Sequence, residues 1–362
     1  MIVVIADDIT GAAEMAGVAF DYGLRVRLVL GLDEGLPVAD VVVVATDTRS
    51  MSASQAVAVT KEVMARLLMH AKERMPFPVL FKKTDSALRG HVMEELEAIL
   101  ASGPYKKAVF LPANPSRGRV IRDGKYYCGD VPISKTDFAF DPEFPALTDS
   151  MVARFPDAAR LGVWMPDASS VGEIEAVVAG IPHDTLLAGA ADLFETLLVH
   201  RGHSRKAMHS PMALDAGDTL VVAGSTQSQP SQLGFPVETM PREVYDGGAG
   251  ATEWIHGVLP VYLHSPGMVL AIPFRHLTGK EVAVRLRQIM ADVVRTLVTA
   301  HPPTTLVLEG GATAYCCLES LSWRQFAIAE VYAPGVIRMV TPQSVSIILK
   351  PGSYPWPLDS FV

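Results

Sequence analysis

The sequence predicts an α/β protein with two domains, each built on a mostly parallel sheet. The chain has 362 residues, more than one hydrophobic core usually serves, and 49% of them are hydrophobic. Short runs of β-branched and apolar residues alternate with segments whose apolar residues recur at helical spacing. Such alternation is typical of parallel strands with helices on both faces of the sheet. We expect the domains to cover residues 1–205 and 206–362.

Five apolar runs in the first half predict the strands of one sheet, at residues 2–5, 26–30, 41–45, 79–81 and 109–111. The first run leads into a helical pattern, "ADDITGAAEMAGVAF". The segment "SASQAVAVTKEVMARLLMHAKE" predicts a longer helix, with Ser52 or Ser54 as its cap. From Asn114 to about Ser150, four prolines interrupt the pattern, so we expect a loop-rich insertion there.

The alternation resumes beyond this insertion. "LGVWMPD" and the helical "SVGEIEAVVAG" form a second α/β passage, and the charged, aperiodic residues 200–218 predict a linker. In the second half, "DTLVVAGST", "GMVLAIP", "TTLVLEGG" and "VSIILKPGS" predict strands. The segment "TGKEVAVRLRQIMADVVRTLVTAH" predicts a long amphipathic helix.

Charge and cysteine content limit the partners. A net charge of −8 gives no general attraction to nucleic acid or to an anionic membrane, so any anion site must be local. The three cysteines, Cys128, Cys316 and Cys317, are an odd and sparse set that favours a reducing compartment. The beginning "MIVVIADDIT" lacks the basic region of a secretion signal. We therefore expect a cytoplasmic protein without nucleic-acid or membrane partners, and the apolar composition permits a homodimer.

Polar clusters follow four predicted strands of the first half: Asp7-Asp8, Thr46 to Arg49, Lys82 to Arg89, and Asn114 with Arg117. Ligands of open parallel sheets bind beyond the carboxyl ends of the strands, so these clusters predict one cleft. Cations there suit a carboxylate or a phosphate, and paired aspartates suit sugar hydroxyls, proton removal or a magnesium ion. The alternative is that each cluster is a solvated loop, and the presence of four clusters at one edge argues against it.

Three small-residue turns follow strands of the second half: "AGSTQSQ", "EGGATA" and "KPGS". Glycines between a strand and a helix let backbone N–H groups approach a phosphate, although ordinary turns look the same. A P-loop and a complete dinucleotide fingerprint are both missing. His200, His203 and His209 lack acidic or cysteine partners at ligand spacing, so we assign no metal-binding residues.

The motifs "IADDITGA", "TDTRS", "FKKTDSALRG" and "LPANPSRGRVIRDGKYYCGD" resemble those of the four-carbon acid sugar kinase family. The likeness continues in "GGATA", "EVYAPGV" and "LKPGS" and so spans nearly the whole chain. It implies a sugar-acid-binding N-terminal domain and a smaller nucleotide-binding C-terminal domain. It also implies ATP- and Mg²⁺-dependent phosphorylation of threonate, erythronate or 3-oxo-tetronate at the terminal hydroxyl.

The resemblance assigns roles to the clusters. We expect Arg49, Lys83 and Arg89 to hold the substrate carboxylate, because the planar fork of arginine binds a carboxylate through two bonds. The expected substrate-binding set is Asp7, Asp8, Arg49, Lys83, Asp85, Arg89, Asn114 and Arg117. We favour Asp85 over Asp8 as the group that takes the proton from the attacking hydroxyl. The expected ATP-binding set is Ser225, Gly310, Gly311, Ala312, Thr313 and Gly352.

Departures from the family pattern lie mostly in the second half. Ala312 stands where the family's double-glycine turn carries an acid, and the turns "AGSTQSQPS" and "KPGSYPWP" are altered. These changes leave open an alternative, a nucleotide-impaired relative that binds a sugar acid in a regulatory role. In the first half, Ala87 and His91 replace a threonine and an asparagine, which is expected to alter substrate choice.

Overall fold

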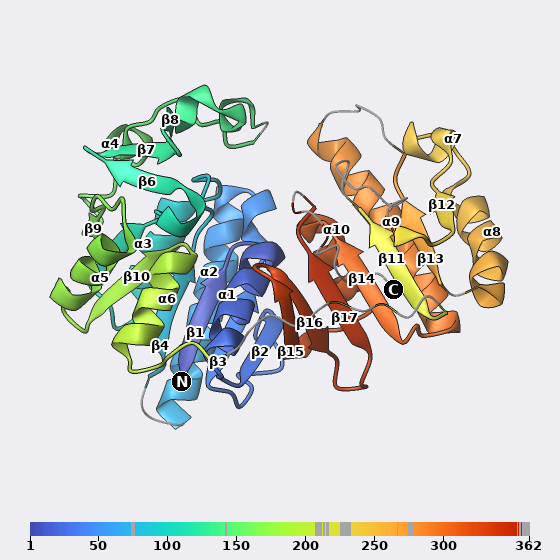
Figure 1. Cartoon of the computed structure of the whole chain (residues 1–362), viewed down its shortest axis with the longest axis horizontal. Coiled ribbons are helices and arrows are strands. Elements are labelled where there is room, and N and C mark those ends of the chain that lie inside the picture. The colour runs from blue at the N-terminus through green and yellow to red at the C-terminus, as the bar shows by residue number, and fades with distance from the viewer. Residues whose placement is uncertain are drawn as a thin grey trace. The chain divides into compact units, whose positions relative to one another are not determined.

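The chain forms two compact α/β units, Met1–Ala207 and Met208–Val362. The computed structural model describes residues 1–73, 77–141, 143–206, 217–224, 233–265, 267–273 and 279–352, with the single residues 212, 214, 354 and 356. Each unit contains a mostly parallel sheet flanked by helices (Figure 1), which confirms the predicted fold class. Within these residues, no helix combines the length and the apolar character that crossing a lipid bilayer requires.

The sheet of the first unit is parallel in every described pair, in the order β2-β3-β1-β4-β10-β5-β9. Its strands are β1 (Ile2–Ala6), β2 (Val26–Leu30), β3 (Val41–Ala45), β4 (Val79–Lys83), β5 (Lys107–Leu111), β9 (Val163–Trp164) and β10 (Thr185–Gly189). Every residue of β1 and β3 is buried. Helices cover both faces of such a sheet, which explains why these strands read as continuous apolar runs.

Two groups of helices pack against this sheet. The main helices are α1 (Ile9–Asp21), α2 (Ala53–Glu73), α3 (Val92–Ser102), α5 (Val171–Gly180) and α6 (Ala191–His200). Helix α1 packs beside α6, which also contacts α5, and α2 packs beside α3. Helix α2 is the longer helix that the sequence predicts in the first half. Of its two expected caps, Ser52 accepts the Gln55 N–H through Oγ, at 3.4 Å.

The insertion is more regular than the sequence predicted. Residues 114–154, here called the insertion lobe, contain an antiparallel sheet of β6 (Arg119–Arg122), β7 (Lys125–Cys128) and β8 (Val131–Pro132). The lobe ends with α4 (Met151–Arg154) and appears in green in Figure 1. Strands this short carry almost no alternation signal, and Pro132 lies at the end of an edge strand, where its missing N–H is tolerated.

The second unit has a parallel sheet with an antiparallel hairpin at one side, in the order β12-β13-β11-β14-β17-β16-β15. Its strands are β11 (Thr219–Ala223), β12 (Val237–Thr239), β13 (Met268–Ala271), β14 (Thr305–Glu309), β15 (Gln325–Ala333), β16 (Val336–Val340) and β17 (Ser346–Lys350). Its helices are α7 (Arg242–Tyr245), α8 (Ala251–His264), α9 (Lys280–Ala300) and α10 (Gly311–Ser320). The sequence reading did not predict the β15–β16 hairpin, which turns at Gly335 with φ +80°.

A buried ion pair joins β4 to α3. The Lys82 Nζ lies 2.7 Å from Glu95 Oε2, and the two side chains are 1% and 2% exposed. Among the described residues, the ammonium has no hydrogen bond of acceptable geometry, so the attraction to Glu95 is mainly coulombic. Two charges buried this deeply depend on each other for compensation.

We expect Lys82→Met to lower the free energy of unfolding by about 3–5 kcal/mol, because Glu95 is left buried without its counter-charge. The double variant Lys82→Met/Glu95→Leu should recover most of this loss in urea unfolding. Arg160→Met, at an exposed ion pair with Asp157, is the matched control and should unfold like the unmodified protein. A single Lys82 variant as stable as that control would contradict the interpretation.

Candidate functional site

Three loops leave the first sheet side by side. The register pairs Ala6 with Ala45 and with Lys83, so the chain passes out of β1, β3 and β4 at the same level. Strand β1 is also where the strand order reverses, since the chain continues to β2 and β3 on one side and to β4 on the other. Ligands of open α/β sheets bind at such a point.

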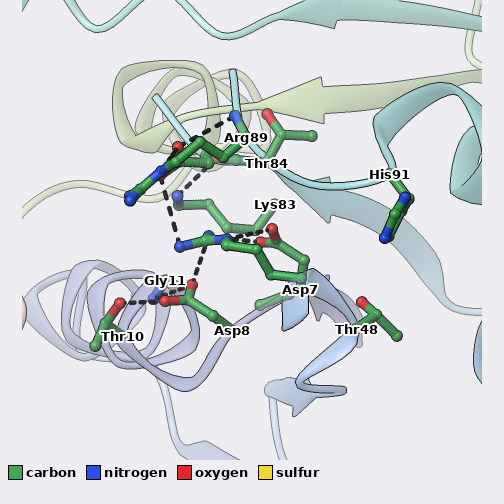
Figure 2. A network of polar contacts seen from close by, with 12 residues as sticks. Asp7, Asp8, Thr10, Gly11, Thr48, Lys83, Thr84, Arg89 and His91 are labelled. Atoms are coloured by element: carbon green, nitrogen blue, oxygen red, sulfur yellow. Dashed lines mark hydrogen bonds and ion pairs between the residues drawn. The ribbon is translucent and has the colours of Figure 1, made fainter. Parts of the chain in front are cut away.

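Arg49 is the centre of the polar groups at this edge. It lies in the turn Thr48–Ser50 after β3 and donates from Nε and Nη2 to the two oxygens of Asp7, at 2.8 and 3.0 Å. Nη2 also donates to Asp8 Oδ1 at 2.8 Å, and Nη1 lies 3.7 Å from Asp85 Oδ1. One guanidinium thus faces three carboxylates from two loops. We call Asp7, Asp8, Arg49, Asp85 and Arg89 the Arg49 cluster (Figure 2).

Asp85 and Arg89 form a closed pair within the turn after β4. Arg89 donates from Nε and Nη2 to Asp85 Oδ2 and Oδ1, at 2.7 and 3.1 Å. Asp85 Oδ2 also accepts the backbone N–H groups of Ala87 and Arg89, at 3.2 and 3.3 Å. The Arg89 side chain is 32% exposed, against 17% for Arg49, so Arg89 is the more accessible guanidinium of the cluster.

Opposite charges keep the buried aspartates ionised. Burial alone would raise the pKa of Asp7, but Arg49 and the more distant Lys82 outweigh burial and hold this pKa below its ordinary value. For Asp85, burial is outweighed by Arg49 and Arg89, and the pKa is again lowered. Burial opposes the charge of Arg49 as well, yet its three carboxylate neighbours raise its pKa well above the ordinary value.

A second set of charges lies beside the cluster, around Glu14 of α1. Lys83 Nζ is 3.4 Å from Glu14 Oε2 and donates to the Thr84 carbonyl at 2.8 Å. Arg117 Nη2 is 3.5 Å from Glu14 Oε1. Glu14, which the sequence analysis missed, lies in the second turn of α1, beyond the Asp8 that precedes this helix.

Asn114 binds the start of a helix and is not part of the Arg49 cluster. It is buried, and its Oδ1 accepts the Asp192 N–H at the start of α6, at 3.1 Å. Asp192 in turn accepts the N–H and the hydroxyl of Ser116, at 2.9 and 2.6 Å. Asp192 is a second residue that the sequence reading missed, and it braces the turn that carries Arg117.

The structure shows where two residues that depart from the family pattern lie. Ala87 is buried in the turn beside Asp85, whereas His91 stands apart from the cluster in Figure 2. The His91 Nε2 is 2.8 Å from the Met51 carbonyl oxygen, and its ring packs edge-on against Phe144. Between them, Gly90 has φ +93°, and a Cβ there would lie 3.0 Å from Asp7 Oδ2. Because the turn passes so close to Asp7 and has this positive φ, the position requires glycine.

In the second unit, the small-residue turns meet at the carboxyl ends of β11, β14 and β17. Gly224 donates to the Glu309 carbonyl at 3.1 Å, and Gly310 donates to the Lys350 carbonyl at 3.0 Å. A Cβ on Gly224 would lie 2.4 Å from Thr313 Oγ1. Gly310 has φ +97° and starts α10, whose first turn contains Gly311, Ala312 and Thr313. Gly352 follows β17, and Ser225 lies outside the described residues.

Glu309 does not occupy the place of the acid that Ala312 lacks. Its Oε1 accepts from Lys350 Nζ at 2.6 Å, and the side chains of this pair are 2% and 1% exposed. The Lys350 ammonium also lies 4.8 Å from the centre of the Trp356 ring. Ala312, in contrast, is exposed at the start of α10. The carboxylate of Glu309 is thus held beneath the turn.

Comparison with known proteins matches the first unit to a family. Residues 2–182, half of the chain, match the model of the sugar-binding N-terminal domain. A D-threonate kinase of Bordetella bronchiseptica is 29% identical over 365 residues, covering 92% of this chain and 88% of that protein. The chain belongs to the four-carbon acid sugar kinase family. This confirms the resemblance drawn from the motifs.

The chain is also similar to a second kinase over part of its length and to a solved structure over nearly all of it. A 3-oxo-tetronate kinase of Methylobacterium radiotolerans is 33% identical over 181 residues, which cover 48% of this chain and 42% of that protein. A solved structure from Salmonella typhimurium has a TM-score of 0.75 at 18% identity, covering 98% of this chain and 96% of the other. The structural likeness establishes the fold.

The Arg49 cluster predicts an unusual dependence of stability on pH. In the unmodified protein the pKa values of Asp7 and Asp85 are lowered on folding, so their stabilisation is present above pH 3.8, the ordinary aspartate value, and is lost as the pH falls below it. In Arg49→Met, burial raises the pKa of Asp7 above the ordinary value, so stability should be lost as the pH rises.

Urea unfolding of Arg49→Met between pH 4 and pH 7 measures this effect. The difference from the unmodified protein should grow with pH, by about 1.4 kcal/mol for each unit by which the folded pKa changes. Arg160→Met removes the same charge at an exposed position and should follow the unmodified profile. If the stability of Arg49→Met instead runs parallel to that of the unmodified protein across this pH range, Arg49 does not control the ionisation of these carboxylates.

Proposed function

We propose that this chain is an ATP-dependent kinase that phosphorylates the terminal hydroxyl of a four-carbon sugar acid: threonate, erythronate or 3-oxo-tetronate. The observation that carries the proposal is the Arg49 cluster, which offers buried carboxylates and an accessible guanidinium at one point of the sheet edge. Its residues lie within the segment that matches the sugar-binding family model. A sugar acid carries the complementary groups, since its hydroxyls donate and its carboxylate accepts.

The two arginines of the cluster have different roles in this proposal. Arg49 is already bonded to Asp7 and Asp8, so it holds the aspartates in place. Arg89 is the more exposed guanidinium and meets the substrate carboxylate from its Nη1 side, where Asp141 Oδ2 lies 3.5 Å away. Lys83 and Arg117 add positive charge from the side of Glu14, and Asn114 supports the turn of Arg117 through α6.

We propose Asp8, rather than Asp85, as the acceptor of the hydroxyl proton. Asp85 Oδ2 already accepts three hydrogen bonds, and its lowered pKa makes it a weak base. Within the described residues, Asp8 Oδ2 accepts one hydrogen bond, from the Thr10 hydroxyl. The Asp8 side chain is 15% exposed, against 11% for Asp85 and 4% for Asp7. Phosphoryl transfer needs little from this base beyond orientation of the hydroxyl.

The glycine turn of the second unit is the proposed nucleotide site. The backbone N–H groups of Gly311, Ala312 and Thr313 lie in the first turn of α10, where the helix field favours phosphate oxygens, while the Gly310 N–H is bonded to the Lys350 carbonyl. Gly352 follows the neighbouring strand β17, and Ser225 stays an expected nucleotide-binding residue outside the described residues. Bound MgATP supplies the phosphoryl group. Among the described residues, no group of three histidine, cysteine or acidic side chains is arranged to hold a metal ion. This fits Mg²⁺ carried largely by nucleotide phosphates and water.

Ala312 supports a second candidate, a nucleotide-impaired protein that binds a sugar acid as a regulator. The first turn of α10 offers no carboxylate at this position, and Glu309 is bonded to Lys350 instead. The sugar-acid side keeps its charged groups in either case. The two candidates therefore differ only in whether phosphoryl transfer occurs once the sugar acid is bound.

A coupled ADP-release assay with MgATP and a panel of four-carbon acids separates the candidates. The kinase should release ADP only when one of the tetronates is present. Thermal stabilisation by a tetronate without ADP release would instead identify the regulator. Neither stabilisation nor ADP release, with folded protein and magnesium present, would refute both.

Substitution of the two aspartates tests the proton acceptor. Asp8→Asn should lower kcat about 100-fold or more. The melting temperature should change little, because Asp8 caps α1 by accepting the Gly11 N–H through Oδ1, at 2.9 Å, and asparagine can do the same. Asp85→Asn should mainly raise KM, since Arg89 loses its partner. The reverse pattern, with kcat lost in Asp85→Asn and retained in Asp8→Asn, would make Asp85 the acceptor.

A further inference from the structure

The turn that carries Asp85 and Arg89 is held from outside by the insertion lobe. The Tyr126 hydroxyl of β7 donates to the Ser86 carbonyl at 2.6 Å and shares a longer bond with the Pro112 carbonyl at 3.1 Å. Arg154, the last residue of α4, donates from Nη2 and Nε to the Leu88 carbonyl, at 2.9 and 3.3 Å. The lobe thus binds alternate carbonyls of this turn.

Peptide geometry connects these bonds to the carboxylate of Asp85. In a trans peptide the C=O of one residue and the N–H of the next point in opposite directions within one plane. The Ser86 carbonyl shares its plane with the Ala87 N–H, and the Leu88 carbonyl shares its plane with the Arg89 N–H. Both N–H groups donate to Asp85 Oδ2. Each donor from the lobe therefore fixes the orientation of a peptide plane whose N–H group donates to Asp85.

The backbone of the turn needs this support. Leu88 has φ +63° although it carries a side chain, and that side chain is buried. Residues in this region persist only where their surroundings hold them. The lobe also reaches Arg89 directly, because Asp141 Oδ2 lies 3.5 Å from Arg89 Nη1.

The two donors are specialised for this contact. Tyr126 is fully buried, and burial raises its pKa well above the ordinary value, so its hydroxyl stays a donor over the working pH range. In the part of the chain that the structure describes, Arg154 donates to the backbone carbonyls of Leu88, Phe144 and Pro145. Its guanidinium therefore joins the turn to the 144–145 segment of the lobe.

We propose that Tyr126 and Arg154 are positioning residues for the sugar-acid site, which act by fixing the peptide planes that orient Asp85 and Arg89. The inference rests on the proposed function, because it assigns a role in binding the substrate carboxylate. Neither residue touches the substrate. Their effect reaches it through the geometry of the Arg89 guanidinium.

Kinetics of Tyr126→Phe and Arg154→Met test the role. Each should raise KM for the tetronate about tenfold, with kcat within about threefold, because an unpaired buried carbonyl lets the plane rotate. Arg154→Lys should recover part of the affinity. A merely structural role would lower the active fraction, and so kcat, without changing KM. Tyr127→Phe and Arg160→Met, in the same part of the first unit, are matched controls and should leave both constants unchanged.

Hydrogen exchange gives a readout that needs no activity. In Tyr126→Phe and Arg154→Met, amides of the peptide spanning residues 84–90 should exchange at least several-fold faster than in the controls, while α1 and α2 keep their protection. Faster exchange in a protein with no tetronate activity would refute the proposed kinase and retain the positioning role. Unchanged exchange and unchanged KM in folded Tyr126→Phe and Arg154→Met would overturn the inference.

Discussion

The site depends on the contact of one guanidinium with three carboxylates. Asp7, Asp8 and Asp85 come from two loops at the end of a buried sheet, where like charges repel and desolvation is costly. Arg49 stabilises the ionised state of Asp7 and Asp85 and also donates to Asp8, and Arg89 and Lys83 complete the charge balance. A nearly neutral site of this kind suits a ligand with both hydroxyls and a carboxylate. It offers less to a simple anion, because the aspartates then have no donors to meet.

The two units differ in how closely they follow the family pattern. In the first unit, Ala87 lies in the turn of Asp85 and His91 stands apart from the cluster, so both changes leave its charged groups intact. In the second unit, the change at Ala312 falls in the first turn of α10, where a nucleotide phosphate is proposed to bind. Family membership therefore supports the proposed sugar-acid site more strongly than the proposed nucleotide site. Catalysis of phosphoryl transfer depends on positioning and electrostatics, so a small change in that turn has large consequences for rate.

The insertion lobe is a folded structure formed by a segment that the sequence predicts to be irregular. Its short strands bury Tyr126 and bring Arg154 against the turn of Asp85. The polar ends of these side chains bind backbone carbonyls, so the lobe acts on the orientation of the turn rather than on its chemistry. Polar groups buried in this way require partners of suitable geometry, which makes the arrangement specific.

The sequence by itself determined the α/β class, most strand positions and the placement of Asp7, Arg49 and Asp85 at one edge, because parallel strands of one sheet end at one edge. It could not distinguish Lys82 from Lys83, whose side chains leave β4 on opposite faces toward Glu95 and Glu14. Only the tertiary structure showed that Asp85 is saturated with donors and which distant side chains hold its turn. The partners of Ser86 and Leu88 lie 40 and 66 residues away, and short-range patterns do not encode such contacts.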